Sequence, residues 1–334
     1  MVEKEPKDWR ELLGWIANDP AGMQRLVQSL GVRDITIRRW VKKESDPRPQ
    51  NLRRLLIALP EYRERFIELI PLEFEDFADF TLDDPHQEIP PKFYTQIFQM
   101  RGNVGPTQLF WSLTDAILGQ ALDQLDPEHL GMAITVVKCM IAARPDHKIL
   151  SLRQSVGQAS APWPGNLEQT AMFLGAESLA GYVVSTCHPS EVQNYKEDNE
   201  ALPGHQLDHE VSAAAHPILY AGRVAGCLLV SSTEPDYFML PGRLNLVADY
   251  AHLISLAFAP ADFVDPTHIE LRLMPPHSEQ RSFFSTFRKR ITEARLKLYG
   301  QHNVDAEQYV WEGLERDILK LPENGDSLNS VGVL

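Results

Sequence analysis

The sequence predicts a multidomain chain in which a small all-α bundle precedes a larger α+β domain that has helical segments on either side of it. The length of 334 residues suits two domains of ordinary size. The composition changes abruptly after residue 70, where a partly basic segment gives way to an acidic one. Beyond that point strand-like and helix-like apolar patterns alternate, which is typical of an α+β domain.

The overall composition excludes several classes of protein. With 43% hydrophobic and 23% charged residues the chain is able to bury a core, and no apolar run approaches the roughly 18–20 residues of a membrane span. Residues 1–9 are charged and lack the apolar stretch of a signal peptide, so we expect a soluble, cytoplasmic protein with no membrane partner. Cys139, Cys187 and Cys227 lack CxxC spacing, which argues against a disulfide framework and against a metal site.

Positive charge is concentrated near the N-terminus. Residues 1–70 hold 14 Lys and Arg against 11 Asp and Glu, in a chain whose net charge is −14. The cations are densest between residues 32 and 54, where they are Arg33, Arg38, Arg39, Lys42, Lys43, Arg48, Arg53 and Arg54. Such a cluster suits a polyanion such as DNA, although a solvated helical face has the same composition.

Two short amphipathic helices are predicted on either side of Gly31. Apolar residues at helical spacing predict one helix over residues 23–30 and another over residues 34–41, with Ile37 and Trp40 facing inward. Two short helices that meet across one glycine form a helix-turn-helix, whose second helix can lie in the major groove of DNA. The residues left facing outward, which we predict to contact DNA, are Arg33, Thr36, Arg38 and Arg39.

A family resemblance supports this interpretation. The run LGVRDITIRRW, followed by PRPQNLRRL, resembles the XRE family of phage-repressor-like helix-turn-helix domains over roughly residues 9–70, with Val27 where the family usually has alanine. The resemblance implies a closing helix over residues 51–59, double-stranded DNA as a partner and a homodimer. It also implies that some cations contact phosphates, namely Lys42, Lys43, Arg48 and Arg53. A helical bundle that does not bind DNA is the alternative.

Residues 71–92 are predicted to be a linker that follows a first domain over residues 1–70. Seven acidic residues and no Lys or Arg lie between residues 73 and 88, before a pair of prolines. From Phe93 to Leu125 apolar residues then recur at helical spacing, with a break near residues 102–106. This pattern predicts a helical connector that leads into the larger domain.

The larger domain alternates strand and helix signals. Strands are predicted over residues 132–142, 149–156, 211–219 and 223–231, and helices over residues 177–186 and 240–258. The last two strands form a hairpin that turns on Tyr220, Ala221 and Gly222. Strand-strand-helix-strand-strand-helix around one sheet is an α+β sensor architecture.

A second resemblance covers roughly residues 107–260. The runs SAAAHPILYAGRVAGCLLVSS and LNLVADYAHLISLAF are similar to the C-terminal half of GAF domains, and GAESLAGYVVST resembles the helix that precedes the ligand-covering loop of that family. The resemblance implies a GAF-like sensor domain within residues 93–260 that binds a small-molecule effector or mediates dimerisation. It does not imply which ligand or cofactor is bound, so the cofactor is unknown.

Candidate ligand contacts lie around the long stretch between Thr186 and Val211, which has little periodic signal. Because loop and sheet converge there in GAF domains, the candidates are Tyr182, Tyr195, His205, His209 and His216. The two loop histidines are four residues apart, but no third metal ligand is evident, so we expect them to be solvated. Cys187-His188 lies too far upstream to anchor a bilin, and Cys187 is interpreted as a turn cysteine.

Residues 261–334 are predicted to be a helical extension with a disordered tail from residue 323. An apolar set that includes Phe283, Phe287 and Leu296 is interleaved with Arg and Lys, and a final helix is expected over residues 306–321. We expect the apolar side of the basic helix to pack on the sensor domain or on a second subunit, although this helix could also contact DNA.

The sequence as a whole predicts a DNA-binding transcriptional regulator whose sensor domain modulates operator binding. The alternative is a protein-interaction module that uses the same folds without specific DNA binding. A GAF-type thiol redox enzyme has less support, because no cysteine lies between Cys187 and Cys227, where such enzymes carry theirs. No catalytic residue is predicted, and we expect that the chain is not an enzyme.

Overall fold

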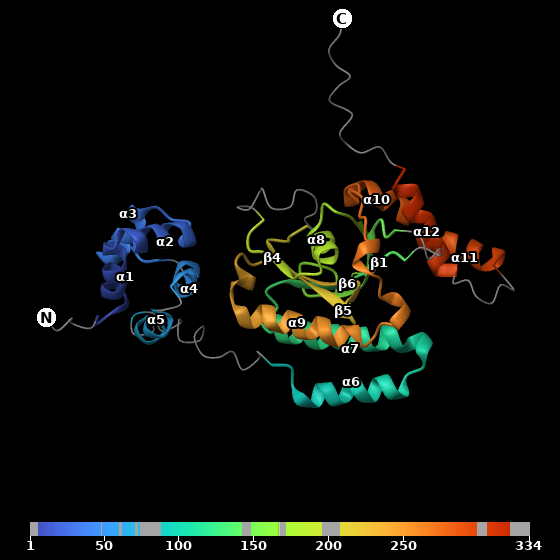
Figure 1. Cartoon of the computed structure of the whole chain (residues 1–334), viewed down its shortest axis with the longest axis horizontal. Coiled ribbons are helices and arrows are strands. Elements are labelled where there is room, and N and C mark those ends of the chain that lie inside the picture. Colours follow the sequence, from blue (N-terminus) through green and yellow to red (C-terminus); the bar gives the residue numbers. More distant parts are fainter. Residues whose placement is uncertain are drawn as a thin grey trace, which may run out of the picture. The chain divides into compact units, whose positions relative to one another are not determined.

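The computed structural model describes residues 6–47, 49–59, 62–70, 73, 88–141, 148–165, 167, 172–195, 208–298 and 306–320. The chain divides into two compact units, residues 1–87 and 88–334 (Figure 1). Most of the predicted linker, the predicted tail, Arg48 and His205 lie outside the described residues. Within the described ranges, no helix is long and apolar enough to cross a membrane.

The first unit is an all-α bundle. Its helices are α1 (Trp9–Asn18), α2 (Pro20–Leu30), α3 (Asp34–Val41), α4 (Pro49–Ala58) and α5 (Arg63–Leu69). Side chains cap two of them, because Asp8 accepts a hydrogen bond from the Glu11 amide and Asp19 accepts one from the Gly22 amide. Their apolar faces share one core. This unit agrees with the predicted helical bundle.

The turn between α2 and α3 is built on Gly31. Its φ is +63°, in the left-handed region that favours glycine, and its amide donates to the Val27 carbonyl at 3.1 Å, which ends α2. The helix α3 then begins at Asp34, as the pattern predicts. The helix α2 starts at Pro20, three residues before the predicted start, because Asp19 caps it and proline suits a first helical position.

The second unit contains a six-stranded antiparallel sheet. Its strands are β1 (Met132–Cys139), β2 (Leu152–Ala159), β3 (Phe173–Leu174), β4 (Ser190–Val192), β5 (Ser212–Tyr220) and β6 (Arg223–Ser232). The strand order is β3-β2-β1-β6-β5-β4. The predicted α+β class and the β5–β6 hairpin are confirmed, with both turn residues, Ala221 and Gly222, at positive φ. The short strands β3 and β4 are not predicted, and β2 begins at Leu152 rather than residue 149.

Helices cover both faces of this sheet. They are α6 (Pro91–Asn103), α7 (Pro106–Leu125), α8 (Leu179–Thr186) and α9 (Pro241–Ser255). The helices α7 and α9 lie along one face and α6 packs on α7, whereas α8 lies on the other face (Figure 1). The break near residues 102–106 is confirmed. However, α7 is part of the core rather than a separate connector, since Leu113, Ile117 and Leu118 are fully buried.

The C-terminal helices pack at the β3 end of the sheet. They are α10 (His277–Phe284), α11 (Phe287–Lys297) and α12 (Ala306–Ile318). Trp311 lies with its ring centroid 5.9 Å from Phe173 and 4.4 Å from Phe287. The buried Gln280 side chain accepts from the Phe173 amide at 2.8 Å and donates to the Phe173 carbonyl at 2.9 Å. The apolar side therefore packs on the sheet domain, as expected, but Leu296 is 75% exposed and does not belong to it.

One glycine in the sheet has no substitute. Gly226, in β6, has φ +149°, and a Cβ there would lie 1.9 Å from the Val137 carbonyl oxygen of β1. That distance is far below any real carbon–oxygen contact, and the neighbour is backbone that cannot move aside. The close pairing of β1 and β6 at this point therefore depends on glycine.

Candidate functional site

The exposed side of α3 carries positive charge over a buried apolar side. Ile37 is fully buried and Trp40 is 3% exposed, so both hold the helix against the bundle. Arg33, Arg38 and Arg39 are exposed. Thr36 is half-buried beside them. The structure therefore brings together on one short helix and its N-cap the four residues that the sequence predicts as DNA contacts.

Further cations follow α3 along the chain. Lys42 and Lys43 are exposed, and Lys43 lies 3.4 Å from Asp8 in an ion pair. Arg48 and the side chain of Arg53, also predicted to contact phosphates, lie outside the described residues. The exposed Arg38–Asp34 pair is long, at 3.9 Å, and such pairs contribute little energy, so it does not prevent Arg38 from binding an anion.

A buried arginine fixes the C-terminal end of α3. Arg10 is 1% exposed, and its guanidinium donates to the Trp40 carbonyl, to Asp46 at 2.6 Å and to Glu73 at 2.9 Å and 3.1 Å. The Trp9 indole also donates to Glu73, at 2.6 Å. The hydrogen bonds from Arg10 lower the pKa of Glu73, against the opposing effect of burial. One side chain thus ties α1, α3, the loop at residue 46 and residue 73 together.

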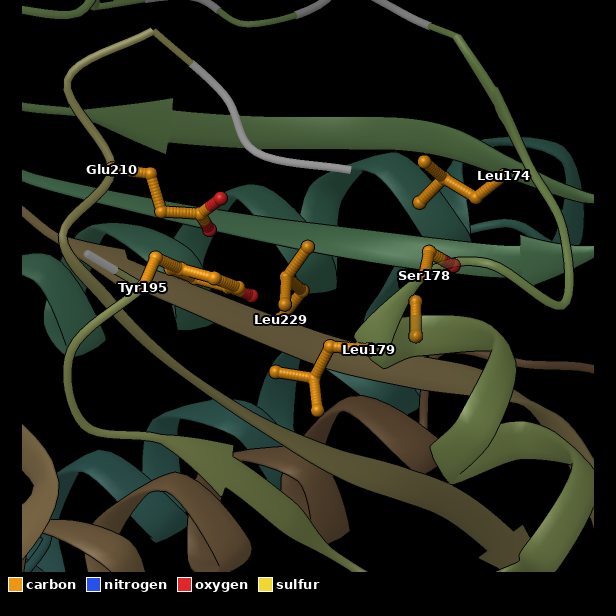
Figure 2. A pocket seen from close by; sticks show the side chains of 7 residues that line it. Leu174, Ser178, Leu179, Tyr195, Glu210 and Leu229 are labelled. Atoms are coloured by element: carbon orange, nitrogen blue, oxygen red, sulfur yellow. The ribbon is translucent and has the colours of Figure 1, made fainter. Parts of the chain in front are cut away.

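The second unit contains a small cavity between α8, β6 and the chain that leads into β5 (Figure 2). The space between its lining side chains is about 250 Å³ when the open solvent at its mouth is counted, and the closed part has room for about one water molecule. Its lining residues are Leu174, Ser178, Leu179, Ala180, Tyr195, Glu210 and Leu229. The leucines provide apolar walls, whereas Glu210 and Tyr195 place a carboxyl and a phenol side by side at one end (Figure 2).

The polar end of the cavity is held in place. Glu210 is 3% exposed and accepts a hydrogen bond from the Ser231 hydroxyl at 2.5 Å. The amide of Tyr195 donates to the Val211 carbonyl at 2.9 Å. Burial, with a contribution from the negative charge of Glu210, raises the pKa of the Tyr195 phenol. That phenol is therefore protonated at neutral pH and able to donate, while the carboxyl of Glu210 is able to accept.

Ser178 has a structural role at the other end. Its hydroxyl accepts from the Gly181 amide at 3.0 Å and donates to the Gly175 carbonyl at 2.9 Å, which makes it the N-cap of α8. A Cβ on Gly181 would lie 1.9 Å from that same carbonyl oxygen. The close turn before α8 therefore shapes this wall of the cavity.

The predicted ligand contacts are only partly brought together. Tyr195 lines the cavity, but Tyr182 is 48% exposed on α8 and His209 is exposed, and neither belongs to the lining. His216 lies on the opposite face of the sheet, with its ring 5.2 Å from that of His252 in α9. Burial lowers the pKa of His216. Sequence reasoning missed Glu210, because a lone acidic residue before a strand gives no signal of burial.

The residues that the structure describes form neither a metal site nor an activated thiol. Across the described ranges, no group of His, Cys, Asp and Glu could hold a metal ion. Burial raises the pKa of Cys139 to about 12 and also raises the pKa of Cys187 and of Cys227, so the thiolate form is disfavoured at all three. Cys187 is half-buried and ends α8 at φ +54°, which agrees with its interpretation as a turn cysteine.

Comparison with known proteins gives likenesses to solved structures. No protein-family model matches the chain, and no curated protein matches it. The chain is similar to the GAF domain from an Acinetobacter phosphoenolpyruvate-protein phosphotransferase, with 20% identity over 50% of this chain and 90% of that domain, and a TM-score of 0.34.

The chain is also similar to two free methionine-R-sulfoxide reductases. For the type II enzyme of Thermoplasma acidophilum the identity is 15% over 47% of this chain and 99% of that one, with a TM-score of 0.32. For the enzyme of Neisseria meningitidis in complex with its substrate the identity is 13% over 51% and 92%, with a TM-score of 0.35. Likenesses of this size assign no activity to the chain.

Proposed function

We propose that this protein is a transcriptional regulator that binds duplex DNA through α3 and responds to a small molecule held in the cavity of its second unit. The observation that carries the proposal is the exposed arginine set of α3. Arg33, Arg38 and Arg39 face outward from a helix whose other side is buried through Ile37 and Trp40.

The dimensions and chemistry of α3 suit the major groove. An α-helix with its side chains is about 10–12 Å across and the major groove is about 12 Å wide, so α3 can enter it. A guanidinium donates two parallel hydrogen bonds to a guanine edge, and hydroxyl groups such as that of Thr36 contact bases or phosphates. Lys42 and Lys43, just beyond the helix, suit phosphates.

The second unit supports a sensor role. Its main elements follow the order β1, β2, α8, β5, β6, α9, which is the order that the strand and helix patterns predict for an α+β sensor architecture. The cavity offers a carboxyl acceptor at Glu210 and a phenol donor at Tyr195 beside apolar walls, which suits a small molecule with hydrogen-bonding groups on an apolar body. An effector that distinguishes two states of a homodimer changes DNA affinity by about 5–150-fold, which corresponds to about 1–3 kcal/mol.

The test of DNA binding compares three forms of the full chain on a pool of genomic duplex fragments. These are the intact protein, the Arg38→Ala/Arg39→Ala variant and the Lys7→Ala/Arg63→Ala variant, which removes the same charge from exposed positions outside α3. We expect selective enrichment of a two-fold symmetric site by the intact protein and the control, lost in the α3 variant. Enrichment that survives in the α3 variant, or none at about 50–100 mM salt, would contradict the proposal and favour the protein-interaction alternative.

The test of the cavity uses ligand-dependent thermal stabilisation. A library of small metabolites is screened against the intact chain and against Leu229→Trp, which fills the cavity from β6. A true cavity ligand stabilises the intact chain and leaves the filled variant unchanged, because a ligand stabilises only a fold that binds it. Equal stabilisation of both forms would place the ligand elsewhere.

A further inference from the structure

The helix α11 is strongly basic in an otherwise acidic unit. Its 11 residues include Arg288, Lys289, Arg290, Arg295 and Lys297 against one acid, Glu293. Residues 88–334 together hold 18 Lys and Arg against 29 Asp and Glu. A polyanion that approaches this unit is therefore repelled by most of its surface and attracted at α11.

One flank of α11 is already engaged with α12. Arg290 forms an ion pair with Asp317 at 2.9 Å, and the Lys297 ammonium lies 3.4 Å from the Tyr309 hydroxyl. Ala294 is 4% exposed in the core that α11 and α12 share. These contacts fix the orientation of α11, so its remaining flanks are defined as well.

The opposite flank presents two arginines, Arg288 and Arg295, for which the described part of the chain supplies no acidic partner. Arg288 and Arg295 are seven residues apart, so they lie on the same side of the helix and about 10 Å apart at 1.5 Å per residue. Both are exposed, and neither forms an ion pair with any residue that the structure describes. Between these two flanks, Lys289 pairs with Glu293 at 3.9 Å. Among the described residues Arg288 and Arg295 are therefore the two arginines of α11 without an ion pair.

We propose that the Arg288/Arg295 flank of α11 binds backbone phosphates of duplex DNA on the outer side of the sequence that α3 reads. This inference rests on the proposed function, because it extends the same DNA contact. A guanidinium can donate two parallel hydrogen bonds to the oxygens of one phosphate. A duplex carries one negative charge per about 1.7 Å of its axis. Two arginines about 10 Å apart can therefore contact phosphates at many positions along the duplex. The contact adds affinity and no sequence preference.

The experiment measures DNA affinity as a function of salt on two duplexes, one limited to the selected site and one extended on both sides. The full chain is compared with Arg288→Ala/Arg295→Ala and with a charge-matched control on α6, Lys92→Ala/Arg101→Ala, whose two side chains are also exposed. On the extended duplex we expect the α11 variant to lower the slope of log affinity against log salt by about 3.6, since a bound dimer loses four phosphate contacts and each contributes about 0.9. Between 50 and 200 mM salt this makes the loss of affinity about 150-fold smaller than for the intact chain. The control keeps the intact slope, and on the short duplex all three agree.

The outcomes separate this inference from the proposed function. Equal slopes for the intact chain and the α11 variant on the extended duplex overturn the inference while leaving site binding through α3 intact. A slope that falls for the α11 variant, in a chain whose binding does not depend on Arg38 and Arg39, contradicts the role of α3 and with it the placement of the α11 contact beside the sequence that α3 reads. If the intact chain binds neither duplex, both fail. Unchanged thermal unfolding of each variant establishes that the substitutions, all at exposed positions, leave the fold in place.

Discussion

Replacing Glu73 with glutamine removes one charge from the buried cluster that holds the end of α3. Glu73 accepts hydrogen bonds from Arg10 and from the Trp9 indole, while the Arg10 side chain is only 2% exposed. The substitution keeps the size of the side chain but leaves the Arg10 guanidinium with Asp46 as its remaining acidic partner in this cluster. The expected result is a less stable first unit, with α1 and α3 loosened together.

The size of the loss in the free energy of unfolding depends on which charged group loses its partner. Hydrogen bonds to charged groups contribute about 1.5–3 kcal/mol, and leaving a buried charge without its partner costs more than removing both charges. We therefore expect Glu73→Gln to lower the free energy of unfolding by about 2–3 kcal/mol. Removing the other partner, by Arg10→Met, leaves the carboxylates of Glu73 and Asp46 without the guanidinium. Their side chains are 37% and 71% exposed and can be hydrated, so we expect a smaller loss in the free energy of unfolding, about 1–2 kcal/mol.

Hydrogen exchange on the intact chain measures this loss locally. A destabilisation of 2–3 kcal/mol raises the opening equilibrium about 30–150-fold, so amides of α1 and α3 exchange faster by that factor while those of β1 and β6 provide an internal control. For the double variant Arg10→Met/Glu73→Gln we expect a loss in the free energy of unfolding that is at least about 1 kcal/mol smaller than the sum of the two single losses, because Arg10 and Glu73 are in direct contact. Additive losses, or a larger loss for Arg10→Met than for Glu73→Gln, would refute this reasoning.

The pH dependence of the same pair has a defined sign. The folded-state pKa of Glu73 lies below its ordinary value of 4.5, so its stabilising contribution is complete above about pH 4.5 and is lost as the pH falls through the lower folded value. The difference in stability between the intact chain and Glu73→Gln, measured by urea unfolding, should therefore shrink on acidification below pH 4.5. A difference that grew on acidification would contradict the hydrogen-bonded carboxylate.

Three further predictions concern particular backbone positions and thiols. Gly31→Ala should cost about 1–2 kcal/mol in the unfolding of the first unit, because L-residues disfavour φ +63°, whereas Gly102→Ala, within a helix and clear of neighbours, should stabilise slightly. Gly226→Ala should prevent the second unit from folding, so circular dichroism should show loss of the sheet signal; a native spectrum would contradict the close approach of β1 and β6. In the folded chain a thiol reagent at pH 8 should modify half-buried Cys187 before the two buried cysteines, and mass spectrometry that found all three modified at equal rates would contradict their burial.

Local signals in the sequence predict the turn between α2 and α3 and the hairpin of the second unit, but they predict neither α1 nor α5. Gly31, with apolar residues at helical spacing on each side, predicts the end of α2 and the whole of α3, because a left-handed residue and an amphipathic pattern each act within a few residues. The β5–β6 hairpin was equally local. By contrast, β3 has two residues and exists through pairing with β2, and Ile149 pairs with Ile269 rather than extending β2. Such contacts join distant segments and leave no local pattern.

The cavity was harder to predict for the same reason. The sequence pattern selects Tyr195 from the long aperiodic stretch. Its neighbour in space, Glu210, is buried and bonded to Ser231 of β6, which lies 21 residues further along the chain. His216 was assigned to the cavity from its strand, whereas the alternation of β5 turns it towards His252 on the other face. Successive residues of a strand point to opposite faces of the sheet, so an error of one residue moves a side chain out of a site, although the fold class stays the same.

The packing of α7 determines where the second unit can be joined to another protein. Tyr250 of α9 donates to the Gln124 side chain, which in turn donates to the Glu88 carbonyl at 2.9 Å, so the first described residues of the second unit are bonded into its core. A chimera that joins the second unit to another domain at the start of β1 would expose the apolar face that α7 covers and would aggregate. Fusion at or before Glu88 preserves that layer.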